Sequence, residues 1–168
     1  ELLTEMPEID AVLGVGSIHH ITDAIEAALA KSEKYARFDD KEKLELGGDR
    51  VITTGDAYAY LKISEGCNNR CAYCAIPYIR GNMRSRTVED IVAEAKTLDE
   101  MGIKELILVA QDTSAYGFDL YGEYALPRLI RAITDATKIP WIRLLYCYPD
   151  KITPALVAEM AGNDRVVK

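Results

Sequence analysis

The sequence contains no apolar run that approaches membrane-spanning length, and no signal-peptide pattern opens it. It also lacks a surplus of positive charge: the formal net charge is −7 and the pI is near 4.9, which argues against a general attraction to nucleic acid. Cysteine is scarce, and three of the four cysteines lie in one short stretch, an odd number that argues against a disulfide framework. These absences predict a cytoplasmic protein with reduced cysteines and no membrane partner.

The length of the chain suits one domain or a little more. It has 168 residues, of which 49% are hydrophobic, so it can bury a sizeable core. Its first residue is Glu1, and the following Leu2-Leu3-Thr4 is typical of the interior of a helix or strand. We therefore expect a piece of a longer protein, cut at both ends.

The most distinctive stretch covers residues 64–86 and holds Cys67, Cys71 and Cys74, spaced C-x3-C-x2-C. Thiolates this close repel one another, so they need a metal cation or an iron cluster to hold them. A structural zinc site has four closed ligands, and an electron-transfer cubane usually has four cysteines, whereas this stretch offers three. Three thiolates on a four-iron cluster leave one iron open. The spacing therefore predicts an iron–sulfur cluster at which a small molecule can bind and be activated.

Another interpretation of the cysteines stays open. Cys147, His19 or His20 could complete a zinc site, which would make the chain a non-catalytic zinc or iron–sulfur module. For the two histidines, a role as surface polar residues near the start of a helix is favoured over metal ligation. Inert core cysteines do not gather at this spacing in a stretch so rich in glycine, asparagine and arginine.

Composition divides the chain into three parts. Residues 1–35 combine a short apolar run ending in glycines with apolar residues at helical spacing, which predicts one β-α unit at the end of a larger α/β domain. The residues at helical spacing are Ile18, Ile21, Ile25 and Leu29. Residues 36–52 alternate in charge sign and predict a solvated charged linker. Residues 53–168 form the third part.

In the third part, predicted strands and helices alternate. Apolar and aromatic runs predict strands at 58–63, 106–110 and 141–146, and Val166-Val167 begins another. Thr87 and Thr153-Pro154 are typical helix starts. The buried stripe expected on the first of these helices is Val88, Ile91, Val92, Ala95, Leu98 and Met101. Strands that alternate with helices imply right-handed crossovers and a parallel sheet, so the predicted fold class is α/β.

Three unusual loops follow the three predicted strands. They are the cysteine loop, residues 111–117 and residues 147–150. Parallel strands end at the same edge of a sheet, where proteins of this class bind their ligands. We therefore expect the three loops to form one functional face.

The cysteine loop is locally basic. The stretch from Cys67 to Arg86 contains no acidic residue, in a chain of net charge −7, and holds four arginines: Arg70, Arg80, Arg84 and Arg86. Positive charge there would stabilise thiolates and an anionic cluster, and would attract a carboxylate ligand. Alternatively, some of these arginines form salt bridges with the acidic residues of the following helix.

These motifs resemble a known family. Gly66 with the C-x3-C-x-Y-C pattern after a first strand is similar to the radical S-adenosylmethionine (SAM) enzymes. The continuation Cys74-Ala75-Ile76-Pro77, with Arg80-Gly81 and Arg84-Ser85-Arg86, resembles their methylthiotransferase branch. Three later motifs resemble the enzymes that methylthiolate an aspartate of ribosomal small-subunit protein twelve. They are Val109-Ala110-Gln111-Asp112-Thr113, Tyr116-Gly117-x-Asp119-Leu120-Tyr121-Gly122 and Tyr146-x-Tyr148-Pro149.

The resemblance covers essentially all of the chain and implies a specific fold and chemistry. Residues 53–168 would be the first half of a radical-SAM (β/α) barrel, preceded at 1–35 by the end of an amino-terminal methylthiotransferase domain. Cys67, Cys71 and Cys74 would hold a [4Fe–4S] cluster whose open iron chelates the amino and carboxylate groups of SAM. One electron from a reductant would cleave SAM to methionine and a 5′-deoxyadenosyl radical. The product would be a methylthio group on the β-carbon of an aspartate.

Two further residues are candidates for cofactor binding, and no catalytic residue is assigned. Gln111 ends the second predicted strand, where related radical-SAM enzymes place a polar contact to the methionyl amino group. Its alternative role is to satisfy local loop backbone. Tyr73 could present an aromatic surface to a cofactor ring, and its alternative role is packing under the cluster.

The family also implies parts that this sequence does not contain. An auxiliary [4Fe–4S] cluster is held in the family by three cysteines of the amino-terminal domain, which are absent here, as is a carboxy-terminal substrate-recognition domain. Cys147 replaces a usually apolar residue and is interpreted as a packing variant. We expect this piece to bind at most one cluster, to be inactive alone, and to be poorly soluble through an unpaired strand edge at 141–146.

The nearest competing function is that of the sister enzymes, which methylthiolate an N6-modified adenosine in transfer RNA. They share the cysteine loop but favour Gly-Gln-Asn where this chain has Ala110-Gln111-Asp112. The acidic balance also leans against an RNA substrate, so we expect no nucleic-acid partner for this piece.

Overall fold

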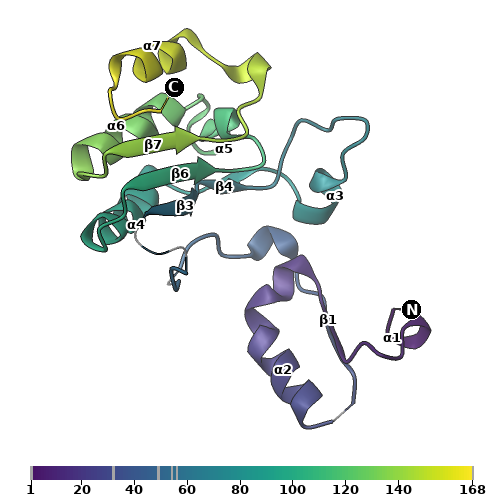
Figure 1. The fold of residues 1–168 in the computed structure, drawn as a ribbon. Coiled ribbons are helices and arrows are strands. Elements are labelled where there is room, and N and C mark those ends of the chain that lie inside the picture. The colour runs from purple at the N-terminus through teal and green to yellow at the C-terminus, as the bar shows by residue number, and fades with distance from the viewer. Residues whose placement is uncertain (1, 32, 49, 54, 56, 168) are drawn as a thin grey trace.

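The computed structural model describes residues 2–31, 33–48, 50–53, 55 and 57–167, so Glu1 lies outside the described residues. It consists of a small amino-terminal unit and a larger unit built on a parallel sheet (Figure 1). This arrangement confirms the predicted α/β class. Within the part of the chain that is described, no helix is long and apolar enough to cross a membrane.

The small unit is a β-α-β arrangement. It contains α1 (Leu2–Glu5), β1 (Ala11–Leu13), a 3-10 helix (Val15–His20), α2 (Ile21–Leu29) and β2 (Tyr35–Arg37). β1 and β2 pair in parallel, with Ala11 opposite Tyr35. The second strand therefore continues into the stretch where the sequence indicates a linker. The domain boundaries themselves stay a prediction.

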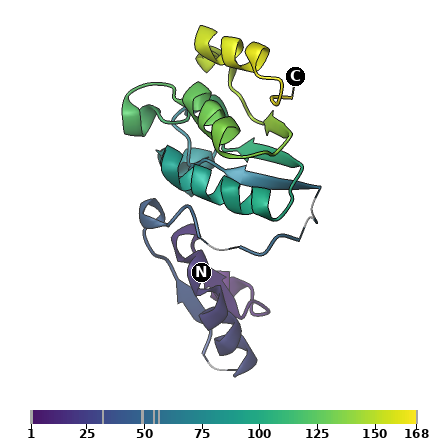
Figure 2. The ribbon, with the colours of Figure 1, turned by 90° about the vertical axis from the view of Figure 1, so that its left-hand side faces the viewer.

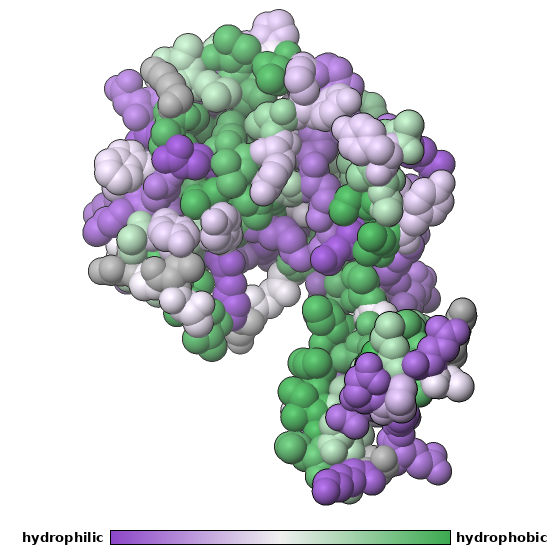
Figure 3. All heavy atoms as spheres, turned by 45° about the vertical axis from the view of Figure 1, so that its right-hand side comes forward, coloured by the Kyte–Doolittle hydropathy of each residue, from purple (hydrophilic) through white to green (hydrophobic). Residues whose placement is uncertain are grey.

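The apolar face of α2 lies open. Helical spacing predicts this helix correctly, yet Ile18, Ile21 and Ile25 are each more than half exposed and Leu29 is 79% exposed. Ala24 is the buried residue of the helix. Figure 3 shows this face as a hydrophobic band along the lower lobe of the molecule.

The larger unit has a three-stranded parallel sheet. Its strands are β3 (Tyr58–Lys62), β6 (Glu105–Val109) and β7 (Trp141–Leu144), in the order β3-β6-β7. β3 buries alternate residues, whereas the three middle residues of β6 are all buried, as expected for a strand covered on both faces. Register aligns Leu61 with Leu108 and Leu108 with Leu144.

Helices cover the sheet and close the core. α4 (Val88–Glu100) and α6 (Leu126–Ala136) pack side by side on one face of it (Figure 2), and α7 (Pro154–Gly162) contacts α6. The Thr87 hydroxyl accepts a hydrogen bond from the Asp90 amide at 3.2 Å, and Thr153 accepts one from the Leu156 amide at 3.1 Å, so both predicted helix starts are confirmed.

The prediction that Met101 belongs to the buried stripe of α4 is wrong. Val88, Ile91, Ala95 and Leu98 are buried, but Met101 is 53% exposed. The helix ends at the preceding residue, so the helical periodicity that places the other four side chains toward the sheet no longer directs Met101.

The prediction of an unpaired strand edge at 141–146 is also wrong. The amide of Ile142 donates to the carbonyl of Arg165 at 2.7 Å, and the amide of Val167 donates to the carbonyl of Ile142 at 2.9 Å. The carboxyl-terminal segment thus pairs with the outer edge of β7, and the strand predicted to begin there is present as a parallel bridge. Sequence patterns do not reveal this pairing because it involves only a few residues.

Candidate functional site

The three loops that follow β3, β6 and β7 meet, as the sequence predicts. Asn69 of the cysteine loop donates to Asp112 after β6 at 2.8 Å. The amide of Tyr148, after β7, donates to the hydroxyl of Ser114 at 2.9 Å. These bonds join residues more than thirty positions apart, so the carboxyl ends of the parallel strands form one connected face.

The cysteine loop begins and ends in a short hairpin. β4 (Ser64–Glu65) pairs antiparallel with β5 (Arg84–Ser85), which brings the two ends of the loop together. Gly66 follows β4 with φ at +79°, and a Cβ there would lie 2.1 Å from the carbonyl oxygen of Asn82. Only glycine meets both conditions, so Gly66 is required for the chain to enter the loop at this angle.

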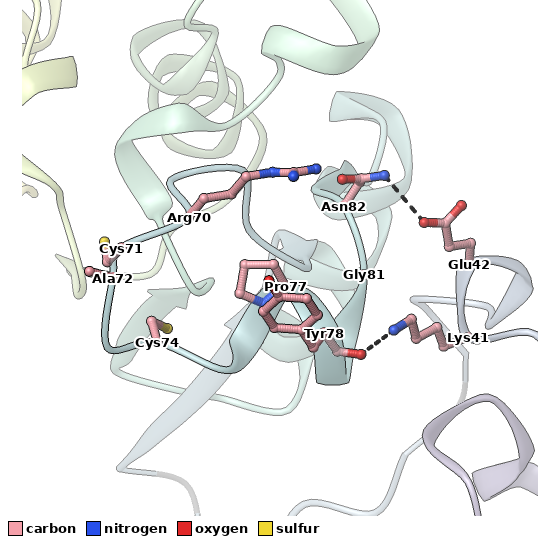
Figure 4. A pocket seen from close by; sticks show the side chains of 10 residues that line it. All are labelled: Lys41, Glu42, Arg70, Cys71, Ala72, Cys74, Pro77, Tyr78, Gly81 and Asn82. Atoms are coloured by element: carbon pink, nitrogen blue, oxygen red, sulfur yellow. Dashed lines mark hydrogen bonds between the residues drawn. The ribbon is translucent and has the colours of Figure 1, made fainter.

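The three cysteines of the loop differ in exposure. Cys67 is buried, whereas Cys71 and Cys74 are half-buried, and all are free thiols. The amide of Cys74 donates to the carbonyl of Cys71 at 3.0 Å, forming a turn before α3 (Ile76–Arg80). In Figure 4 the sulfurs of Cys71 and Cys74 point away from each other.

The charged stretch before the larger unit packs against this loop. A 3-10 helix (Lys41–Lys43) lies beside it, and the Arg84 guanidinium donates to the carbonyls of Lys41, Glu42 and Leu44 at 2.7–2.9 Å. The Lys41 ammonium also donates to the carbonyl of Tyr78. Part of the predicted solvated linker is therefore attached to the loop through main-chain carbonyls.

A cavity of about 340 Å³ opens between this 3-10 helix and the loop (Figure 4). Arg70 lines it together with Cys71 and Cys74. Arg70 has a left-handed backbone, with φ at +48°, an uncommon conformation for a residue other than glycine. Of the four loop arginines, Arg70 is the one that lines this cavity with Cys71 and Cys74, and in Figure 4 its guanidinium extends toward Asn82.

Arg86 forms salt bridges with acidic residues of the following helix, which is the alternative role considered for the loop arginines. Its buried guanidinium lies 2.6 Å from both Asp90 and Glu94 on α4, and it donates to the carbonyl of Lys62 at 2.9 Å. Burial alone would lower the pKa of Arg86, but these two carboxylates raise it above the usual value. The positive charge of Arg86 is thus used in anchoring the hairpin to α4.

A buried carboxylate, Glu65, stands directly before the loop. Its side chain is 3% exposed, and it accepts from the Lys62 ammonium at 3.1 Å with Arg80 at 3.6 Å. Burial would raise the pKa of Glu65, but the hydrogen bond and charge of Lys62 and the charge of Arg80 lower it below its usual value. Glu65 is therefore ionised at neutral pH and acts as a hydrogen-bond acceptor.

Gln111 binds this carboxylate and not the loop backbone. Its Nε2 donates to Glu65 Oε1 at 2.9 Å. Because an ionised carboxylate only accepts, the amide orientation is determined, and Oε1 of Gln111 points away from Glu65. That oxygen is buried and has no hydrogen-bond partner in the described part of the chain. The site therefore presents a fixed, unsatisfied acceptor.

Tyr73 does not pack under the loop. Its ring is 92% exposed, so the packing role considered for it is not observed, and the face of the ring is available to a ligand. Tyr148 lies beside Cys71: a side-chain hydrogen bond with Cys71 and the charge of that thiol raise the pKa of Tyr148.

The sequence does not reveal the structural role of the Tyr-Gly-x-Asp motif. The buried hydroxyl of Tyr116 donates to the carbonyl of Arg86 at 2.8 Å, the amide of Gly117 donates to the hydroxyl of Ser85 at 3.0 Å, and Asp119 accepts from the amide of Ser85 at 2.7 Å. α5 (Phe118–Tyr121) thereby holds the hairpin that bears the cysteine loop. The density of polar and aromatic residues in the motif is the only sequence signal of this role.

The histidines lie in the small unit. Among the residues described, His19, His20 and Asp39 are the only three metal-ligating side chains whose ligand atoms all lie within 4.8 Å of one another. Arg37 Nε lies 2.7 Å from Asp39 Oδ2, so a guanidinium already neutralises that carboxylate. No cysteine joins this group, and burial together with the charge of Asp112 raises the pKa of the Cys147 thiol. The geometry thus offers no closed zinc site at the cysteines.

Comparison with known proteins decides the family. The profile of the radical SAM superfamily matches residues 61–167, which include the cysteine loop, β6 and β7. The chain belongs to the radical SAM superfamily. Membership implies an iron–sulfur cluster and SAM as cofactors.

Individual relatives match the whole chain. The ribosomal protein uS12 methylthiotransferases RimO of Clostridium tetani, Acetivibrio thermocellus and Thermoanaerobacter sp. are 49%, 50% and 47% identical to it, and each match covers 100% of this chain. The chain spans only 38–39% of the length of these relatives.

One solved structure also resembles the chain. The radical S-adenosylmethionine methyltransferase TsrM from Kitasatospora setae, with cobalamin and a [4Fe–4S] cluster bound, is similar over 62% of this chain and 20% of that chain. The identity is 20% and the TM-score is 0.49, a likeness too slight to transfer details of either fold or function.

The residues of this radical SAM chain fit both implied cofactors. A single tetrahedral zinc ion needs sulfurs about 3.8 Å apart, whereas Cys67, Cys71 and Cys74 do not all lie within 4.8 Å of one another. In an iron–sulfur cluster each thiolate binds a different iron, which suits a wider spacing. The unsatisfied oxygen of Gln111 is a hydrogen-bond acceptor, and an ammonium group such as that of SAM could donate to it.

Proposed function

We propose that this chain is the cluster-bearing part of a radical SAM methylthiotransferase that adds a methylthio group to the β-carbon of an aspartate of ribosomal protein uS12. The observation that carries the proposal is identity of 46–50% along the chain to proteins named uS12 methylthiotransferases. Each match runs along the whole chain, so it extends beyond the cysteine loop and spans the loops after β6 and β7.

Within this function, Cys67, Cys71 and Cys74 would be the three protein ligands of a [4Fe–4S] cluster. When bound, the cluster supplies the electron that cleaves SAM. The chain's own part is to hold three thiols on a closed loop: Gly66 directs the chain into it, and the amide of Met83 is tied back to Asn68 Oδ1 at 3.0 Å. Arg70 lines the same cavity as Cys71 and Cys74 and adds a positive charge to it.

Gln111 and Tyr73 would bind SAM. Glu65 holds Gln111 so that its free oxygen accepts from the SAM ammonium group, and this arrangement needs no reorientation of the amide on binding. The exposed ring of Tyr73 would stack on an aromatic part of the cofactor. No residue of the chain is assigned to proton or hydrogen transfer.

The complete reaction needs more than this chain. We propose that a second, auxiliary [4Fe–4S] cluster supplies the sulfur in the longer protein, because Cys147 is the only cysteine outside the loop and a cluster needs several thiolates. A one-electron reductant is the further partner that the chemistry requires.

The test is a chimera in which these 168 residues replace the matching segment of the Clostridium tetani relative. Reconstituted anaerobically with iron, sulfide, SAM and a reductant, it is incubated with uS12 and with transfer RNA. A methylthio mass increment on an aspartate of uS12, absent in the Cys71→Ala chimera, is the expected result. An increment on transfer RNA alone would assign the function to the sister enzymes, and zinc without iron would indicate a non-catalytic module.

A further inference from the structure

A closed triangle of side chains holds the middle of the cysteine loop. Asn69, which lies between Cys67 and Cys71, donates from Nδ2 to Asp112 Oδ2 at 2.8 Å. Its Oδ1 accepts from the Lys151 ammonium. The ammonium also lies 3.0 Å from Asp112 Oδ2, which completes the triangle.

The triangle is built from three separate loops and is largely buried. The Asp112 side chain is 2% exposed and that of Lys151 is 14% exposed. Aspartate only accepts and lysine only donates, so the Asn69 amide has one orientation that satisfies both. The hydroxyl of Ser114 donates to the second carboxylate oxygen of Asp112 at 2.6 Å, which leaves this carboxylate fully satisfied.

The electrostatics agree with a tight arrangement. Burial would raise the pKa of Asp112, but hydrogen bonds from Ser114, Asn69 and Lys151 lower it below its usual value. Burial would lower the pKa of Lys151, but Asp112 and Asp150 raise it. Both groups are therefore charged at neutral pH. Removing Lys151 leaves the buried Asp112 charge without a cation, and removing Asp112 leaves Lys151 paired only with the exposed Asp150.

We propose that Asp112 and Lys151 are positioning residues: through Asn69 they set the path of the loop between Cys67 and Cys71, and hence the geometry in which the thiols hold their cluster. This inference rests on the proposed function, since it assumes a cluster on these thiols. Neither residue touches the cluster, and both act on it through the amide of Asn69. The third-strand loop thereby controls the cysteine loop, although Lys151 is 82 positions from Asn69 in the sequence.

The experiment compares wild-type protein with five variants, each reconstituted with iron and sulfide under anaerobic conditions. Asn69→Ser removes the side-chain amide that bonds Asp112 and Lys151, and it keeps the ion pair between those two residues. Lys151→Gln leaves the buried Asp112 carboxylate without a cation, whereas Asp112→Asn removes the buried partner of Lys151 and leaves it only the exposed Asp150. The double variant Asp112→Asn/Lys151→Gln restores a neutral triangle, because Asn accepts from Asn69 and Gln donates to it. Arg131→Gln breaks the ion pair between the exposed Arg131 of α6 and Glu159 of α7, far along the chain from the cysteine loop, and is the control.

Two readouts separate positioning from general stability. Loss of iron to a chelator should be about tenfold faster in Asn69→Ser and in each single charge variant, and the electron paramagnetic resonance spectrum of the reduced cluster with SAM should change. The double variant should return toward wild type in both. Arg131→Gln should match wild type, and melting temperature is recorded for every protein.

The outcomes are distinct. The inference is overturned if Asn69→Ser equals wild type in iron retention and in spectrum. It is also overturned if the double variant loses iron as fast as its single variants. Where a single charge variant fails to fold, Asn69→Ser and the double variant still decide the matter. Wild-type protein that takes up no iron overturns the proposed function, and the positioning role with it.

Discussion

Gln111 depends on Glu65 for its orientation, and the pair shows how a neighbouring charge prepares a binding group. The Glu65 carboxylate is buried and ionised. It accepts a hydrogen bond from Nε2 of Gln111 and leaves Oε1 of Gln111 without a partner among the described residues. A buried acceptor without a partner costs free energy in the absence of ligand. Such a cost is common where a protein keeps a group ready for a ligand.

We therefore predict that Gln111→Ala weakens SAM binding by about 1–2 kcal/mol, the contribution of a hydrogen bond to a charged group, or roughly tenfold in Kd. Isothermal titration of cluster-loaded protein with SAM measures this change. Iron content equal to that of wild type is the necessary control, and unchanged affinity at equal iron content would remove Gln111 from the site.

Glu65 itself should make stability depend on pH. Its pKa is lower in the folded chain than in the unfolded chain, so its ionised form contributes stability at neutral pH that is lost as the pH falls through the folded-state pKa. Glu65→Gln should reduce the free energy of unfolding by about 1–3 kcal/mol at pH 7. Urea denaturation at a series of acidic pH values should show the difference from wild type shrinking, and a difference independent of pH would contradict this role.

At the scale of elements, the cysteine loop is held from three directions. The hairpin β4–β5 joins its ends, α5 supports that hairpin, and the 3-10 helix Lys41–Lys43 lies against its outer side. Arg84 links two of these contacts, because it belongs to β5 while its guanidinium binds the carbonyls of the 3-10 helix. A flexible, glycine-containing loop thus gains order from regular elements around it.

Arg84→Met should release the 3-10 helix from the loop. Three hydrogen bonds from a charged donor would be lost, each contributing about 1.5–3 kcal/mol at most. Trypsin should then cleave after Lys41 or Lys43 at least about tenfold faster, since cleavage follows local opening. Fragment masses over time report the rate. Arg131→Gln, which breaks an ion pair elsewhere, should not accelerate cleavage at these sites.

On the scale of the whole molecule, the cysteines are concentrated at one edge of one sheet. Three of the four cysteines lie in the loop after β3, and the fourth has a raised thiol pKa after β7. The histidine and aspartate group in the small unit is already paired with Arg37. These observations support a single cluster in this chain.

Reconstituted protein should therefore contain about four iron atoms and about four sulfides per chain. Replacing any one of Cys67, Cys71 or Cys74 with alanine should abolish the bound cluster, because the remaining two thiolates cannot hold it. Cys147→Ala is the matched control and should keep nearly full iron. Iron and sulfide analysis with visible absorption spectra measures both, and full iron content in Cys71→Ala protein would contradict the ligand assignment.

The sequence by itself determined the three strands of the larger sheet, the main helices, the parallel pairing and the resemblance to the family. Those features follow from local periodicity, capping residues and the spacing of three cysteines, all of which act over a few residues. The family resemblance, together with the end of the second predicted strand, pointed to Gln111, but neither indicated that Glu65 would hold its amide. The exposed face of α2 and the exposed Met101 were not foreseeable, because periodicity shows which residues share a face and not what covers it.

Only the tertiary structure decided which partner each charged side chain has. Arg86 pairs with α4, Arg84 binds main-chain carbonyls of a segment forty positions away, and Lys151 reaches Asn69 across 82 positions. The reason is physical: a long flexible side chain can reach many partners, and the one it binds is set by which elements the fold brings within about 3 Å. Charge composition therefore indicated a basic loop, whereas folding pairs Arg80 and Arg86 with carboxylates and leaves Arg70 lining a cavity with Cys71 and Cys74.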